Sequence, residues 1–327
     1  MKEENIKLPF AVRIIAGSDE EVGCTDLDYY VKVQKPPFFA FTPDSEYPVC
    51  IGEKHIWGFS LCFDAPDGIE INGGTVENSV PAFANAIIKN VKSVPEYKAK
   101  GITAVLTDKG LEVKAEGKNA HAAMPESGIN AIGILCDWML KAGITDAPCI
   151  KLIRDCCSEY DGKTLGINCS AEHFGDLTCV GSIIKTANGK IEILFNVRCP
   201  VGDNIDVDKL RGNIIETAEK YSGKYDDKGF SEGYFKNPDD PMIKALTESC
   251  KTVLGGKCEP YTTGGGTYAR HLSDTVAFGA CIPSMAGLNG EGKGGAHQND
   301  EYITLTELYS SIRIFSLSIV AIGENEK

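Results

Sequence analysis

The feature that most constrains the fold is a long middle stretch whose pattern differs from that of both chain ends. Between residues 55 and 237, expected strands and amphipathic helices alternate as in an α+β layer. The flanking segments, residues 1–54 and 238–327, are each too small to bury a stable core alone. We therefore expect the two ends to pack together as one α/β unit, with residues 55–237 inserted into it as a separate domain.

Apolar periodicity and turn residues place the expected elements. The Asn188-Gly189 pair is the strongest short hairpin signal in the chain. Residues 82–91 favour a helix, because apolar side chains recur at helical spacing behind Pro81. The middle stretch is expected to hold strands at 57–63, 69–72, 102–106, 111–115, 183–185 and 191–197, and helices at 82–91, 129–140 and 207–221. The end segments are expected to hold strands at 10–17, 38–41 and 276–280, and helices at 243–254 and 306–322.

Charge and composition narrow the range of functions. The 327-residue chain carries a net charge of −13, which argues against binding nucleic acid or an anionic membrane surface, because both need basic patches. No run of about 18 apolar residues and no signal-peptide segment occurs, so we expect a cytoplasmic protein. The 13 scattered cysteines are interpreted as reduced core thiols rather than a disulfide framework. Small-molecule or peptide chemistry remains as the class of function.

Two acidic loops each follow an expected strand. In open α/β sheets ligands bind beyond the carboxyl ends of the strands, which is where Glu20 and Glu21 are expected. One of two adjacent carboxylates can bind a metal while the other holds the attacking water. Asp44 lies between two prolines and is therefore rigidly aimed, which suits a metal ligand. The plainer alternatives are an acidic surface loop and a proline turn.

Three further loops carry residues suited to binding or catalysis. His297 follows two glycines, His121 lies on a loop of small residues, and Arg270 ends a glycine-rich run. Glycines let the backbone approach a ligand closely, and a guanidinium can grip a carboxylate through two hydrogen bonds. The alternatives are a surface histidine, a histidine that caps a helix, and a solvated arginine in a turn.

The order of these motifs is more specific than any one of them. The chain contains GSDEE at 17–21, TPDSEYP at 42–48, GKNAHAAMP at 117–125, GGGTYAR at 264–270 and GAHQNDEY at 295–302. This series closely resembles the dinuclear zinc metallopeptidases of the aminopeptidase and deacylase type, and within them the dipeptidase V-like branch. The resemblance covers nearly the whole chain, and the TPDSEYP and GGTYAR segments are the most specific for that branch.

The resemblance implies a fold and a metal centre. The fold would be a partial zinc-peptidase-like α/β/α catalytic domain, formed by residues 1–54 and 238–327 and interrupted by an α+β lid domain at 55–237. Glu20 resembles the general base. Glu21 and His297 resemble ligands of one zinc ion, and Asp44 resembles a ligand of the other.

The resemblance also implies a substrate and the residues that bind it. His121 resembles the lid residue that polarises the scissile carbonyl and stabilises the oxyanion, and Asn78 resembles a lid residue that binds substrate. Arg270 resembles the clamp on the free carboxylate of a dipeptide. The expected activity is hydrolysis of dipeptides by a zinc-activated water, with small peptides as partners.

The sequence departs from the family pattern near its start. The family supplies a His-x-Asp motif on an earlier strand and a second aspartate that bridges the two zinc ions. Here no histidine precedes residue 20, and the only aspartate before it is Asp19. The expected strand at 10–17 also has no upstream neighbour. We expect that the chain lacks an amino-terminal part, does not encode the full dinuclear site, binds zinc weakly and has little or no peptidase activity.

Two other interpretations of the function remain open. A related N-acyl amino-acid deacylase would share these motifs, and a non-catalytic truncated homologue would keep the fold without the activity. Several relatives dimerise through the lid, but the long insertion at 55–237 favours a monomer here, with a dimer as the alternative.

Overall fold

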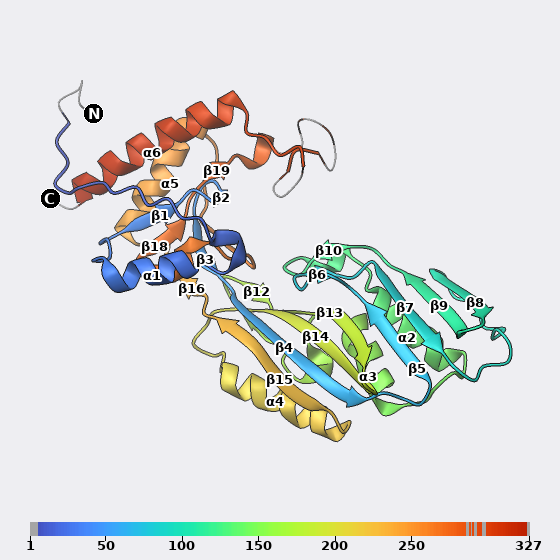
Figure 1. Cartoon of the computed structure of the whole chain (residues 1–327). Coiled ribbons are helices and arrows are strands. Elements are labelled where there is room, and N and C mark those ends of the chain that lie inside the picture. Colours follow the sequence, from blue (N-terminus) through green and yellow to red (C-terminus); the bar gives the residue numbers. More distant parts are fainter. Residues whose placement is uncertain (1–5, 286–287, 289, 291–292, 296–298, 326–327) are drawn as a thin grey trace. The chain divides into compact units, whose positions relative to one another are not determined.

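The chain forms two compact units. The computed structural model describes residues 6–285, 288, 290, 293–295 and 299–325. Unit 1 consists of Met1–Glu53 with Gly233–Lys327, and unit 2 consists of Lys54–Glu232 (Figure 1). The boundaries at 53/54 and 232/233 compare with the expected 54/55 and 237/238. Both units combine helices with sheets, which confirms the α/β class.

Unit 1 is built on a small mixed sheet with the strand order β1-β18-β3-β16, in which β17 also pairs with β3. Strands β1 and β18 run parallel, with Phe41 opposite Val276. Helices α5 and α6 pack against each other (Figure 1). The elements are η1 (Glu20–Val22), α1 (Thr25–Val33), β1 (Ala40–Thr42), β2 (Ser45–Glu46), β3 (Cys50–Glu53), β16 (Tyr234–Phe235), α5 (Pro241–Leu254), β17 (Tyr261–Thr263), η4 (Tyr268–His271), β18 (Thr275–Ala277), β19 (Ala280–Cys281), η5 (Pro283–Met285) and α6 (Leu305–Asn325).

The two long helices of unit 1 begin at identifiable capping residues. The Asp240 carboxylate accepts a hydrogen bond from Met242 N at 2.7 Å, and Pro241 occupies the first turn of α5. Helix α6 begins with a capping box. Thr304 Oγ1 accepts from Glu307 N at 3.1 Å, and the Glu307 carboxylate accepts from Thr304 N at 3.0 Å. These local signals explain why both helices start where the sequence predicts.

Unit 2, all of whose residues are described, is an antiparallel sheet of eight strands in the order β15-β4-β14-β13-β5-β7-β9-β8. Trp57, Phe59, Leu61 and Phe63 of β4 are at most 2% exposed, and their spacing of two residues places them on one face of the strand. Helix α2 packs on β7 and β9, α3 on β13, and α4 on β15. The elements are β4 (His55–Asp64), β5 (Ile69–Gly73), β6 (Ser79–Val80), β7 (Phe83–Ile88), β8 (Ile102–Thr107), β9 (Gly110–Glu116), β10 (Ala120–His121), η2 (Pro125–Ser127), α2 (Ala131–Lys141), α3 (Pro148–Ser158), η3 (Lys163–Leu165), β11 (Ser170–Ala171), β12 (Gly175–Asp176), β13 (Thr178–Ala187), β14 (Lys190–Cys199), α4 (Val207–Lys220) and β15 (Lys224–Ser231).

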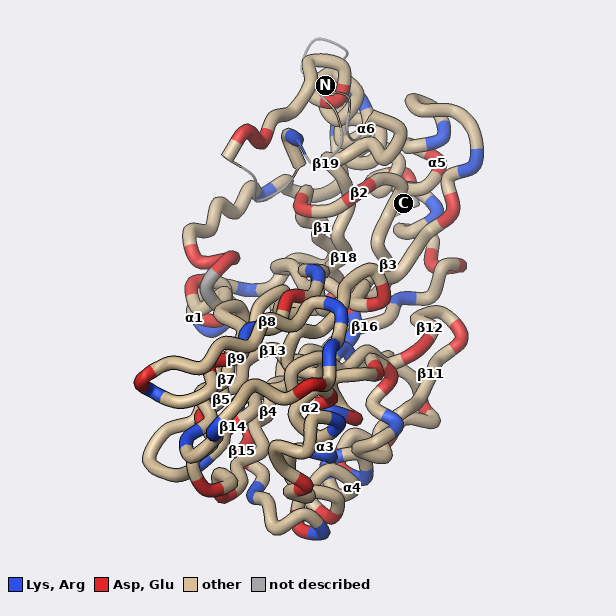
Figure 2. Tube along the Cα trace, turned by 90° about the vertical axis from the view of Figure 1, so that its right-hand side faces the viewer, with Lys and Arg blue, Asp and Glu red and all other residues tan. Residues whose placement is uncertain are grey.

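Charged residues of both signs are interspersed along the chain of unit 2 (Figure 2). Many form exposed ion pairs, such as Lys89 with Glu70 at 2.8 Å and Lys228 with Asp226 at 2.7 Å. Such pairs contribute little to stability because water and salt screen them. The net negative charge is therefore spread over a mixed surface.

The predicted hairpins and most predicted helices are confirmed. Asn188 and Gly189 have φ angles of 52° and 72° and close the β13–β14 hairpin, as a type I′ turn requires. The helices expected at 129–140, 207–221, 243–254 and 306–322 correspond to α2, α4, α5 and α6. The cysteines, all of which lie in the described part of the chain, are free thiols and mostly buried. Helices α1 and α3 and several strands, including β3, β15 and β17, were not predicted.

The helix predicted at 82–91 is wrong, because this segment contains strand β7. Its register between β5 and β9 buries Ala84, Ala86 and Ile88, which alternate with more exposed residues. Ala84 and Ile88 are four residues apart, a spacing that fits a helix and a strand equally well. The neighbouring strands decided between the two periods.

The strand predicted at 10–17 is also wrong. The segment has no regular structure, and its Val12 and Ile14 side chains are 53% and 92% exposed. Strand β1 pairs with β18, and within the described ranges its other edge pairs with no strand. A β-strand needs a partner for its backbone hydrogen bonds, so this apolar run stays irregular.

Candidate active site

The two glutamates predicted to act in catalysis lie on the short helix η1, which leads directly into α1. Glu20 is half-buried and Glu21 is exposed. The neighbouring Asp19 carboxylate accepts hydrogen bonds from Thr25 N at 2.8 Å and from the Thr25 hydroxyl. This places a negative charge at the N-terminus of α1, where the helix dipole favours it. Asp19 thus holds residues 17–21, called the acidic loop below, against the start of α1.

A second carboxylate, Asp26 on α1, ties the same loop to η4. Asp26 Oδ2 accepts hydrogen bonds from Ser18 N at 2.7 Å and from Tyr268 Oη at 2.8 Å. Tyr268 Oη in turn accepts a weaker hydrogen bond from Asp19 N at 3.4 Å. The Ser18 N–H, and less strongly the Tyr268 hydroxyl, hold the pKa of Asp26 below its ordinary value, because they stabilise the ionised form.

Asp44 lies in the turn between β1 and β2 and is exposed. This turn is fixed from both sides. Phe278 N donates to Thr42 O at 2.8 Å, and Ser45 Oγ lies 2.6 Å from Tyr261 Oη. The turn follows the carboxyl end of β1, which runs parallel to β18. In open α/β sheets, ligands bind beyond the carboxyl ends of the parallel strands.

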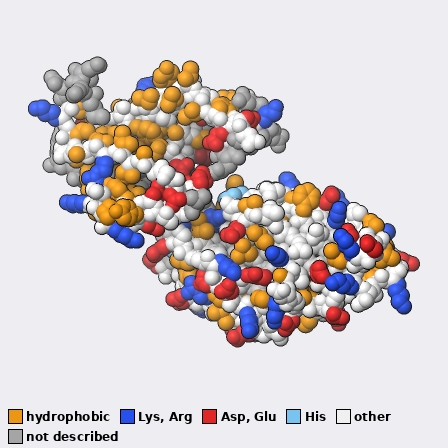
Figure 3. Space-filling view, in the orientation of Figure 1, with side chains coloured by type: hydrophobic (Ala, Val, Ile, Leu, Met, Phe, Trp, Pro, Cys, Tyr) orange, Lys and Arg blue, Asp and Glu red, His pale blue; other side chains and the backbone are white. Residues whose placement is uncertain are grey.

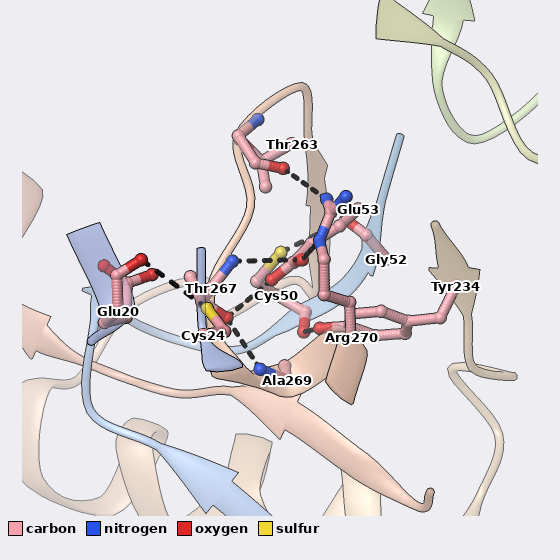
Figure 4. Close-up of polar contacts among 11 residues, drawn as sticks. Glu20, Cys24, Cys50, Gly52, Glu53, Tyr234, Thr263, Thr267, Ala269 and Arg270 are labelled. Atoms are coloured by element: carbon pink, nitrogen blue, oxygen red, sulfur yellow. Dashed lines mark hydrogen bonds and ion pairs between the residues drawn. The ribbon is translucent and has the colours of Figure 1, made fainter. Parts of the chain in front are cut away.

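Arg270 is bonded to a buried carboxylate, Glu53, which was not among the predicted site residues (Figure 4). Glu53 on β3 is fully buried, the Arg270 side chain is 4% exposed, and Arg270 Nε donates to Glu53 Oε2 at 2.9 Å. Thr267 donates to the same carboxylate through its hydroxyl at 2.7 Å and its N–H at 3.2 Å. Burial raises the pKa of Glu53, and Arg270 partly offsets that rise.

The role of Arg270 as a substrate clamp therefore stays a prediction. Its guanidinium also donates to Gly265 O at 3.1 Å, so it bridges β3 and the glycine-rich loop of its own chain. A glutamate inside an apolar strand is the signal that could have drawn attention to Glu53, because a buried carboxylate needs a cationic or hydrogen-bonding partner.

In unit 2 the structure brings Asn78 and His121 together. Strands β6 and β10 pair with Ser79 opposite His121, and Ala122 N donates to Asn78 O at 2.9 Å. Both predicted residues are exposed. His121 Nδ1 accepts a hydrogen bond from Ala123 N at 3.2 Å, so in the neutral ring the proton lies on Nε2. A histidine Nε2–H can donate to a carbonyl oxygen or an oxyanion, which is the chemistry predicted for His121.

A buried guanidinium lies close to this pair in the sheet. Arg198 on β14 is 5% exposed, and its Nε donates to Asn196 Oδ1 at 2.9 Å. It stands opposite Thr178, whose hydroxyl donates to Ala122 O at 2.8 Å, beside His121. Arg198 was not predicted from the sequence, although a charged residue in the apolar run that ends β14 indicates a buried charge that needs a hydrogen-bonding partner.

The described residues do not fit a zinc site. His297, predicted as a zinc ligand, lies outside the described residues. Among those that are described, no group of three or more His, Cys, Asp or Glu side chains could hold a metal ion. Glu20, Glu21 and Asp44 are therefore not gathered into such a group, whereas catalytic zinc sites usually have three protein ligands.

Comparison with known proteins identifies the family. The sequence matches Peptidase family M20/M25/M40 over residues 1–321, and the chain belongs to that family. This confirms the resemblance drawn from the order of the motifs. YtjP of Bacillus subtilis (strain 168), provisionally named a dipeptidase, is 30% identical over an alignment of 346 residues, gaps included. The alignment spans 99% of this chain and 72% of YtjP. A Beta-Ala-Xaa dipeptidase of Lactobacillus delbrueckii subsp. lactis is 28% identical over an alignment of 353 residues, gaps included. The alignment spans 100% of this chain and 72% of the relative.

Solved structures similar to this chain are more distant. A tripeptidase from Staphylococcus aureus aligns with 93% of this chain and 62% of its own length, at a TM-score of 0.46 and 15% identity. Human carnosine dipeptidase 1 aligns with 92% of this chain and 62% of its own length, at a TM-score of 0.42 and 9% identity. The chain thus spans about three fifths of the length of these structures.

Proposed function

We propose that this chain hydrolyses dipeptides. The observation that carries the proposal is the peptidase-family match over residues 1–321, because it includes nearly all of both units. YtjP and the Lactobacillus relative, each aligned with at least 99% of the chain, bear dipeptidase names. Short peptides with a free carboxylate are therefore the proposed substrates.

The proposed roles follow the chemistry of the residues. Glu20 takes a proton from the attacking water and delivers it to the leaving amine, as a general base and then a general acid. His121 donates through Nε2–H to the oxyanion that forms on the peptide carbonyl, and the Nδ1 bond from Ala123 favours the required tautomer. Asn78 lies in the turn directly before β6, beside His121, and helps to bind the substrate.

Zinc is the proposed cofactor, on the strength of the resemblance. Glu21, Asp44 and His297 are its proposed ligands, although the described residues hold no three-ligand group. That observation favours a second candidate function, a non-catalytic homologue that keeps the fold without turnover. The two candidates differ in a single measurable property, the hydrolysis of peptides by the purified chain.

The test is an assay of the purified chain with added zinc against a panel of dipeptides, including a β-alanyl dipeptide, and N-acyl amino acids. We expect slow dipeptide hydrolysis that a chelator abolishes. Glu20→Gln should lower the rate by about 10²- to 10⁴-fold, the usual effect of losing a general base. Glu248→Gln, on an α5 side chain that is 68% exposed, is the matched control and should leave the rate unchanged.

Each other outcome selects a different function. Hydrolysis of N-acyl amino acids in preference to dipeptides would identify a deacylase. Absence of all hydrolysis in excess zinc would identify the non-catalytic homologue. We also propose a cytoplasmic monomer, which light scattering of the purified chain and fractionation of cells would test.

A further inference from the structure

Helix η4 presents two pairs of side chains to two different elements. In a 3-10 helix residues three apart lie on the same side, because there are three residues per turn. Arg270 and the capping residue Thr267 both bond to Glu53 on β3. Tyr268 and His271, one position further along, bond to α1, at 2.8 Å to Asp26 and 3.0 Å to Asp28. Helix η4 therefore joins β3 to α1.

The acidic loop packs directly against Tyr268 of η4. A Cβ atom built on Gly17 would lie 2.1 Å from Tyr268 Oη and 2.7 Å from Asp26 Oδ2. Any larger residue at position 17 would displace the phenol or the Asp26 carboxylate from this position. Ser18 N and Asp19 N then donate to Asp26 and Tyr268 respectively. Three consecutive residues before Glu20 are thus held by two side chains from elsewhere in unit 1.

We propose that η4 is a positioning element for the acidic loop. Tyr268 and Asp26 hold residues 17–19 and so fix the backbone that carries Glu20 and Glu21, while Glu53 fixes η4 through Thr267 and Arg270. Tyr268, Asp26 and Glu53 act through the loop and not on the substrate. The catalytic part of this inference rests on the proposed function, in which Glu20 is the general base.

The charge states of the carboxylates agree with this arrangement. The hydrogen bonds from Ser18 and Tyr268 lower the pKa of Asp26, so Asp26 is ionised at neutral pH and accepts strong, charge-assisted bonds. Glu53 is fully buried and forms an ion pair with Arg270, at 2.9 Å. A buried carboxylate with this partner holds its donors in a defined geometry, which suits the rigid element that we propose η4 to be.

The main test is Tyr268→Phe, which removes only the hydroxyl. The matched control is Tyr225→Phe in unit 2, where a tyrosine hydroxyl also donates to an aspartate, Asp227, at 3.1 Å. We expect Tyr268→Phe to speed hydrogen exchange of the Ser18 and Asp19 amides about five- to tenfold, the effect of about one hydrogen bond on a local opening. Thermal unfolding should change little in either variant.

Peptidase kinetics provide the second readout. With a dipeptide substrate, we expect Tyr268→Phe to lower kcat about ten- to a hundredfold with KM unchanged, because a displaced general base weakens only the transition state. Asp26→Ala should act like Tyr268→Phe, and Asp26→Asn, which keeps an acceptor oxygen, should restore part of the rate. Glu53→Gln should speed exchange in both η4 and the loop, which shows that the restraint passes through η4.

The outcomes separate this inference from the proposed function. Unchanged exchange at Ser18 and Asp19 in Tyr268→Phe would overturn the positioning role, whatever the activity. An active wild type whose kcat is unaffected by Tyr268→Phe would also overturn it and would leave the dipeptidase proposal intact. A wild type without peptidase activity would overturn the dipeptidase proposal, and the exchange measurement would still decide the role of η4.

Discussion

Two carboxylates that bond to η4 respond to their surroundings in opposite directions. Burial raises the pKa of Glu53, whereas hydrogen bonds from Ser18 and Tyr268 lower the pKa of Asp26. A carboxyl whose pKa is lowered on folding contributes stability above its ordinary pKa, and this contribution is lost as the pH falls through the lowered value. For Glu53 the sign is reversed, so its burial disfavours folding as the pH rises through the window between its ordinary and raised pKa values.

The lowered pKa of Asp26 leads to a prediction about how the Ser18 amide responds to pH. We expect the Ser18 amide resonance to titrate with a midpoint below 3.8, the ordinary aspartate value, because that amide is the main group that stabilises the ionised carboxylate. An NMR titration from pH 7 to about pH 2 measures it, and Asp26→Asn should remove the transition. Asp239→Asn, which removes an aspartate whose pKa Lys244 lowers, should leave it in place. A midpoint above 3.8 would contradict the hydrogen bonds assigned to Asp26.

At the scale of elements, α6 is unusual because much of its apolar surface faces outward. The most apolar 18-residue window within Leu305–Glu324 has a mean hydropathy of 1.4, and only 28% of that window is buried. The helix is long and apolar enough to span a membrane, a criterion that core helices of soluble proteins also meet. Figure 3 shows hydrophobic side chains gathered on the visible face of unit 1. Apolar patches of this kind favour association or aggregation.

Two isoleucines on α6 allow this to be tested. Ile312 is 53% exposed and Ile314 is fully buried. We expect Ile312→Lys to change the free energy of unfolding by less than about 0.5 kcal/mol and to reduce self-association. Ile314→Lys should cost about 3 kcal/mol or more, because it buries an unpaired ammonium. Denaturant unfolding and light scattering measure the two effects. Equal destabilisation by both changes would show that the outward face of α6 is covered.

At the scale of the whole molecule, unit 2 has the features of an independent domain. Lys54–Glu232 is one continuous segment with its own large core. Its two ends meet in the sheet, because Ile56 on β4 pairs with Ser231 on β15. Both tryptophans of the chain, Trp57 and Trp138, lie in this unit and are at most 1% exposed. Tryptophan fluorescence therefore reports on unit 2 alone.

We predict that a fragment of residues 54–232 folds without unit 1. Its tryptophan emission should match that of the full chain, and it should unfold in a single cooperative transition, as small domains do. Ile193→Ala, which truncates a fully buried side chain of β14, should cost about 2–5 kcal/mol equally in fragment and full chain. A fragment with the emission of solvent-exposed tryptophan would show that unit 2 needs unit 1 to fold.

The sequence by itself determined the features that local patterns encode. The Asn188-Gly189 turn, the capping residues of α5 and α6 and the division into end segments and a middle stretch all depend on neighbouring residues along the chain. The order of five short motifs was enough to indicate the family, which the match over residues 1–321 confirmed. The positions of Asn78 and His121 on adjacent strands agree with their predicted partnership, although their roles stay predictions.

Only the tertiary structure decided which distant residues meet. Whether 82–91 is a strand and whether 10–17 has a partner depended on neighbouring strands, not on the spacing of apolar residues. Arg270 bonds to Glu53, 217 residues away, and Tyr268 bonds to Asp26, 242 residues away. Periodicity and turn chemistry act over a few residues, whereas such contacts form only when packing brings distant segments together. For this reason the sequence could nominate Glu20, Glu21 and Arg270, but only the fold showed what holds them.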